Sequence, residues 1–168
     1  MDSEIHFTTT IFPLPHLAGN YLEISNAIVQ KLGGKFSLRL ICTINNSLTF
    51  QTGLIALGGG TAYISLNAAR MKKLGVKVGD TVEVSLQKDE SKYGAEMPRE
   101  LAEILKMDEE GFRRFENLLP GKSRYIIQYL LKIKSPQLRI EKALRIIENL
   151  KKCKEGKEAF RDFLNFDS

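Results

Sequence analysis

Two segments of the chain follow one pattern, and this repeat constrains the fold more than any other feature. Residues 21–33 and 63–75 align without gaps over thirteen positions. Tyr, Ala, Lys, Leu and Gly are identical at matching places, and the apolar positions mostly correspond. Self-similarity at a fixed spacing means that one structural unit occurs twice. The chain is therefore restricted to folds in which two like halves can associate.

Each copy of the repeat has the sequence of a short strand, a two-turn helix and a second strand. The first strand ends at Ser25 or Asn67, residue types that cap the N terminus of a helix. Gly33 or Gly75 then ends the helix, because glycine accepts the left-handed conformation found there. Two such units predict a pseudo-two-fold β-barrel that closes within one molecule.

Alternating or β-branched segments predict the strands of this barrel. Asn45-Asn46 is typical of a tight turn, and Gly58-Gly59-Gly60 breaks the pattern at a sharp connection. The triplet leads into a strand, whereas a phosphate-binding loop leads into a helix, so we favour a bulge or turn over an anion site. The expected strands cover residues 5–12, 21–24, 36–44, 48–55, 61–66 and 81–86.

The remainder of the chain has the periodicity of helices. Residues 88–97 lack periodicity and are interpreted as a linker, and Pro98 suits the first position of a helix. Asp108 and Ser135 are placed to cap later helices. We therefore expect an α+β chain with a β-barrel domain over residues 1–92. A helical domain of about four helices is expected over residues 93–168.

Composition excludes several classes of protein. Hydrophobic residues make up 43% of the 168 residues, as in soluble folded proteins, and no apolar run is long enough to span a membrane. The acidic start lacks the basic and apolar regions of a secretory signal. Two cysteines and two histidines rule out a disulfide framework and a cysteine-rich zinc site. We expect a cytoplasmic protein.

Positive charge gathers in the second half and supplies the candidate binding residues. Residues 98–168 hold 16 basic and 12 acidic side chains, against 9 and 8 in residues 1–97. The candidates either contact an anionic partner such as nucleic acid or form an ordinary solvated surface. Tyr125 and Tyr129 interleave with them but fall on an apolar stripe, which favours a place in the core. The candidate cations are Arg70, Lys72, Lys73, Arg124, Arg139 and Arg145.

No residue set indicates a reaction. Cys42 lies on the apolar face of its strand, and Cys153 follows a lysine-rich helix turn. His6 and His16 have no Cys, Asp or Glu at the spacing of metal ligands. We therefore assign no catalytic residue, cofactor or metal site from the sequence.

Several segments of the chain resemble a known family. Residues 63–67 and 74–84 resemble the small β-barrel domain of unknown function that precedes a YdeI/OmpD-associated helical domain. Residues 123–130 and 135–140 fit the helix–Pro–helix core of that "bacteriocin-protection" domain. The family tends to have Trp at the position of Tyr129 and Thr at that of Leu138. The resemblance implies a double-split β-barrel, similar to that of AbrB-like regulators and MazE-like antitoxins and here supplied by a single chain.

Three functions remain open at this stage. The resemblance implies a bacterial protein of a bacteriocin-protection or stress-related family that binds an unidentified partner, without catalysis. The AbrB-like barrel and the basic helices favour nucleic-acid binding as an alternative. An enzyme with a cleft between barrel and helices is the third hypothesis. The intrachain repeat predicts a monomer, and a nucleic acid or a protein is the expected partner.

Overall fold

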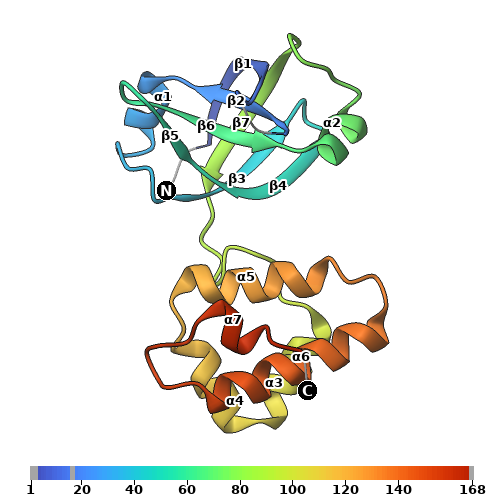
Figure 1. The fold of residues 1–168 in the computed structure, drawn as a ribbon. Helices are drawn as coiled ribbons and strands as arrows, with labels where there is room; N and C mark the ends of the chain where they lie inside the picture. The colour runs from blue at the N-terminus through green and yellow to red at the C-terminus, as the bar shows by residue number, and fades with distance from the viewer. Residues whose placement is uncertain (1–3, 16–17, 167–168) are drawn as a thin grey trace. The chain divides into compact units, whose positions relative to one another are not determined.

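The computed structural model describes residues 4–15 and 18–166 of the chain. It divides into two compact units, Met1–Glu90 and Ser91–Ser168 (Figure 1). The first unit holds all the strands of the described residues and two short helices, and the second unit holds helices only. This confirms the predicted α+β class, with a strand-rich domain followed by a helical one.

The first unit is a curled antiparallel sheet (Figure 1). Its strand order is β4-β3-β7-β1-β2-β6-β5, and every neighbouring pair is antiparallel. Two helices, α1 (Asn26–Lys31) and α2 (Ala68–Leu74), connect strands of this sheet. The strands are β1 (Ile5–Pro13), β2 (Asn20–Ile24), β3 (Arg39–Ile44), β4 (Leu48–Gly53), β5 (Ile55–Gly58), β6 (Thr61–Leu66) and β7 (Thr81–Lys88).

Strand β1 divides its length between two neighbours. In β1, residues 5–10 pair with β7 and residues 11–13 pair with β2. The two outermost strands, β4 and β5, are separated only by the buried Leu54. Both edges of the sheet are therefore consecutive pieces of one stretch of chain. This is the double-split arrangement that the resemblance implied, except that the single strand expected over residues 48–55 is two strands, which meet at Leu54.

The strand register carries the pseudo-two-fold symmetry. The repeat relates residues that lie 42 positions apart, and two such related pairs face each other in the sheet. Leu22 of β2 pairs with Ile64 of β6, and Thr43 of β3 pairs with Ser85 of β7. A rotation that exchanges the two copies therefore leaves both pairs in place. The axis passes through these two pairs.

The structure extends the repeat beyond the thirteen aligned residues. Phe12 of β1 pairs with Tyr21, and Ile55 of β5 pairs with Tyr63 in the other copy. Strand β1 is thus the counterpart of β4 and β5 together. The sequence separation between related residues is one residue larger here than in the rest of the repeat. Each half of the barrel is a strand–strand–helix–strand unit.

Local chemistry explains where the barrel's elements begin and end. The Ser25 hydroxyl accepts the N–H of Ile28 at 3.4 Å, and the Asn67 amide oxygen accepts that of Arg70 at 2.8 Å. Gly75 ends α2 with a φ of 67°, in the left-handed region. Both predicted caps are confirmed. The predicted turns are confirmed as well, because residues 45–46 and 58–60 all have positive φ.

The second unit packs its helices around the longest one. Helix α6 contacts each of the other four described helices of this unit. Its buried side chains, among them Ile146 and Leu150, meet Leu101, Phe115 and Phe163 in the core. No described helix is long and apolar enough to cross a membrane. The helices are α3 (Arg99–Met107), α4 (Glu109–Glu116), α5 (Pro120–Leu131), α6 (Pro136–Lys152) and α7 (Phe160–Phe163).

The boundary of this unit differs from the sequence-based expectation. Pro98 has an extended backbone with ψ of 138°, so it precedes α3 as the N-cap and is not its first residue. Tyr93, Ala95 and Met97 pack into the helical core, although the segment carries no periodicity. The segment interpreted as a linker is therefore largely part of the helical unit. Asp108 and Ser135 cap α4 and α6 as predicted.

We predict opposite effects for two helical glycines. A Cβ added at Gly111 of α4 would lie 2.5 Å from Ile147 Cγ2 of α6, whereas the nearest atom at Gly121 of α5 is 4.0 Å away. Gly111→Ala should lower the free energy of unfolding by about 1–3 kcal/mol through overpacking. Gly121→Ala should raise it, by up to about 1 kcal/mol, because alanine restricts the unfolded chain. Chemical denaturation measures both. A Gly111→Ala protein as stable as the wild type would contradict the packing argument.

We predict that the thiol of Cys42 stays protonated in the folded barrel. Cys42 is fully buried, and this burial raises its pKa to about 12. Above about pH 8.5 the thiol ionises in the unfolded chain but not in the folded one. Its contribution to stability is therefore complete below that pH and falls as the pH rises, by up to about 1.4 kcal/mol per unit. Denaturant unfolding between pH 8 and 10 should show a steeper loss in the wild type than in Cys42→Ala. Equal slopes would overturn the prediction.

Candidate functional site

The six predicted cations divide between the two units. Arg70, Lys72 and Lys73 lie on α2 of the barrel unit. Arg124 is a half-buried residue of α5 in the helical unit, and Arg139 and Arg145 belong to α6. They form two separate groups with different surroundings.

The barrel group combines one fixed cation with two exposed ones. The guanidinium carbon of Arg70 lies 4.0 Å from the centroid of the Phe50 ring on β4. Partial burial lowers the pKa of Arg70, and the side chain is half-buried. Lys72 and Lys73 are exposed in the last turn of α2, where positive charge suits the helix dipole. The geometry thus holds one cation rigidly beside two mobile ones.

Two of the three cations in the helical group are held by contacts within their own unit. Arg139 forms an ion pair with Glu100 of α3, with Nη1 and Oε1 2.7 Å apart. The same guanidinium donates to the carbonyl oxygens of Leu130 and Ile133 at the end of α5. These bonds satisfy backbone acceptors that the helix leaves open. Arg145 donates to the carbonyl of Phe166 at 2.8 Å. Both arginines therefore bind parts of the fold itself.

The two tyrosines that interleave with this group also contact aromatic partners. Tyr129 stacks on Phe166 with an interplanar angle of 15°, and Lys142 Nζ lies 4.0 Å from the centroid of that same Phe166 ring. Tyr129 packs on the core as expected. Tyr125 meets Phe160 edge-on, but 46% of its surface is exposed, so the prediction that it belongs to the core is wrong. Phe160 is exposed too, and the pair lies at the rim of the core.

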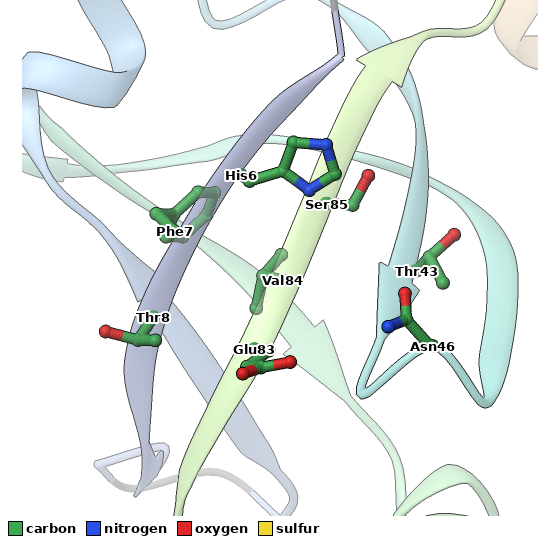
Figure 2. A pocket seen from close by; sticks show the side chains of 8 residues that line it. All are labelled: His6, Phe7, Thr8, Thr43, Asn46, Glu83, Val84 and Ser85. Carbon is green, nitrogen blue, oxygen red and sulfur yellow. The ribbon is translucent and has the colours of Figure 1, made fainter.

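The structure adds a polar hollow that the sequence did not indicate. A pocket of about 400 Å³ opens on the outer face of the sheet, at the pseudo-two-fold axis (Figure 2). Strands β1, β7 and β3 and the turn after β3 supply its lining. We call it the axis pocket; it is lined by His6, Phe7, Thr8, Thr43, Asn46, Glu83, Val84 and Ser85.

Glu4, which is not part of the lining, contacts two lining residues of the axis pocket. The Ser85 hydroxyl donates to one carboxylate oxygen of Glu4, and His6 Nε2 lies 3.5 Å from the other. The carboxylate thus contacts the hydroxyl and the imidazole at once. In a Ser–His–acid triad the imidazole stands between the other two groups. Here the carboxylate stands in that place, so His6 is not set to accept the Ser85 proton.

The rest of the axis pocket offers hydrogen-bonding groups from separate strands. The hydroxyl oxygens of Thr43 and Thr49 lie 2.9 Å apart and form a hydrogen bond. The Asn46 amide faces the hollow from the far side of β7 (Figure 2). Glu83 adds a second carboxylate. Hydroxyls, an amide and carboxylates at one place suit a small polar ligand. Sequence reasoning missed the pocket because its polar strand residues have the ordinary pattern of outward positions, and only the register brings them together.

The other candidates from the sequence remain without a reaction. Among the described residues, no group of three or more His, Cys, Asp or Glu side chains could hold a metal ion. His16 lies outside the described residues. Gly60 accepts a hydrogen bond from the Asn26 amide at 3.0 Å, which ties the triple-glycine turn to the start of α1. Cys153 is half-buried, and burial raises its pKa.

Comparisons with known proteins follow the division into two units. A model described as "Domain of unknown function (DUF1905)" matches residues 7–86, which are the barrel. A second model, described as "Bacteriocin-protection, YdeI or OmpD-Associated", matches residues 94–152 in the helical unit. No curated protein matches the chain. The two matches agree with the arrangement that the resemblance implied, a barrel domain of unknown function followed by a YdeI/OmpD-associated helical domain.

Proposed function

We propose that this protein acts by reversible binding and not by catalysis, and that the axis pocket takes a small polar ligand. The observation that carries the proposal is the position of Glu4 between Ser85 and His6. The Ser85 hydroxyl donates to a carboxylate and not to an imidazole, so it lacks the imidazole that accepts the serine proton in a Ser–His–acid triad. The same groups are well prepared to exchange hydrogen bonds with a ligand.

The test measures binding and turnover in one set of variants. Chromogenic carboxyl and phosphate esters and peptides are incubated with the wild type, Ser85→Ala and His6→Ala. We expect no turnover that these substitutions remove. Amide chemical shifts recorded against sugars, polyols and amino acids should move at Thr8, Thr43 and Asn46. A reproducible turnover that Ser85→Ala abolishes and Thr52→Ala on β4 retains would overturn the proposal.

We further propose the bacterial cytoplasm as the compartment. Cys42 and Cys153 are both free thiols, which suits a reducing environment. Recovery of a disulfide-linked form from intact cells would contradict this assignment.

A second candidate function is the binding of an anionic polymer such as nucleic acid at α2. The specific observation is the stacking of Arg70 on Phe50 beside two exposed lysines. A cation held on an aromatic ring loses little conformational freedom when it meets a phosphate. In the other copy of the repeat, Ile28 occupies the position of Arg70, so this charge belongs to one half of the barrel only.

Salt dependence tests this second candidate. The wild type, Lys72→Gln/Lys73→Gln and Lys31→Gln are titrated with random-sequence DNA and RNA at several salt concentrations. Lys31 is the matched control, because it is the counterpart of Lys73 on α1. Loss of two phosphate contacts should reduce the slope of log K against log salt by about 2 for duplex DNA. No binding at low salt, or an equal loss in Lys31→Gln, would reject α2 as the contact surface.

A further inference from the structure

An apolar pocket of about 460 Å³ opens within the helical unit. It lies where the segment before α3 meets α3 and the start of α4. We call it the helical pocket; it is lined by Tyr93, Met97, Ala102, Leu105, Lys106 and Phe112. Ala102 is the smallest of these side chains, and the space above it is the hollow. Five of the six lining residues are apolar or aromatic, and one carries a positive charge.

The walls of the helical pocket are held in place from behind. The Tyr93 hydroxyl donates to the Glu116 carboxylate, and its ring meets Phe115 edge-on with centroids 5.7 Å apart. Leu105 forms a buried floor with 6% exposure. Phe112 by contrast exposes 44% of its surface. The pocket therefore has a fixed aromatic wall, an aliphatic floor and an exposed ring. Such a preformed slot suits a flat apolar group.

The cation at the rim is available to a ligand. Lys106 Nζ lies 3.5 Å from Glu103 Oε1, but the two side chains are 72% and 57% exposed, so this pair contributes little. The neighbouring Lys92 is engaged more closely, because its Nζ lies 2.7 Å from the Glu116 carboxylate. Lys106 is therefore the ammonium that a bound anion would meet at the edge of the slot.

We propose that the helical pocket binds a small aromatic carboxylic acid. The ring would lie among Tyr93, Met97 and Phe112, and the carboxylate would pair with the Lys106 ammonium. A purely polar ligand would leave the apolar walls facing water, and a neutral apolar ligand would gain nothing from the lysine. The site is independent of the function proposed for the barrel, since all of its residues belong to the helical unit.

The probe is naphthalene-2-carboxylate, titrated into the full-length protein and followed by amide chemical shifts. We expect saturable shifts at Ala102, Leu105 and Phe112. The uncharged analogue naphthalene-2-carboxamide should bind about fivefold more weakly, and Lys106→Gln should weaken the carboxylate by a similar factor while leaving the amide unchanged. Lys132→Gln, which alters an exposed lysine of the same unit outside the pocket, should have no effect.

A second variant tests the pocket without disturbing the core. Ala102→Phe fills the hollow from the surface of α3 and should abolish the shifts, with thermal unfolding confirming that the variant is folded. The proposal is overturned if the wild type shows no saturable shift at these amides. It is overturned equally if the carboxamide binds as tightly as the carboxylate, or if Ala102→Phe retains binding.

Discussion

The barrel depends on two residue pairs that lie on its pseudo-two-fold axis. Leu22–Ile64 joins β2 to β6, and Thr43–Ser85 joins β3 to β7. A slip of one residue in either pairing would move every side chain of a strand to the opposite face. The two copies would then no longer share one axis. The strands β4 and β5, which meet at Leu54, would no longer both pair with their present neighbours. One register thus fixes the core, the closure and the place of the axis pocket.

The helical unit depends on a different kind of constraint, a buried ion pair. Arg114 and Glu158 lie 3.4 Å apart with side chains that are each 6% exposed. Arg114 also donates to the carbonyl of Cys153, and Glu158 accepts the N–H of Gly156. Burial opposes the charge on Glu158, but these hydrogen bonds and the guanidinium outweigh it and hold its pKa below the usual range. The pair ties α4 to the loop that leads from α6 to α7.

Patterns that depend on neighbours in the chain were predicted well. Ser25, Asn67 and Asp108 cap helices through bonds three residues away, and such short-range chemistry is visible in sequence. The repeat predicted the barrel, because each copy of a repeated unit can bury its apolar face against that of the other copy. The bend at Leu54 could not be predicted from the sequence, because it depends on pairing with two different strands. Strand β4 pairs with β3, and β5 pairs with β6. The place of Tyr93 in the helical unit was not predicted for a similar reason, because its partner Glu116 lies 23 residues away in the chain.

Arg70 lies at a position where the two copies of the repeat differ. Inward positions match in kind, as with Leu22 and Ile64, because both copies must fill one core. On the helices one match fails. Ile28 of α1 is buried and lines a hollow together with Phe7, whereas its counterpart Arg70 stacks on Phe50, the counterpart of Phe7. A symmetric scaffold needs no such difference for stability, since the aliphatic contact in one half does the same packing. This asymmetry is one observation that supports the proposed contact between α2 and an anionic partner.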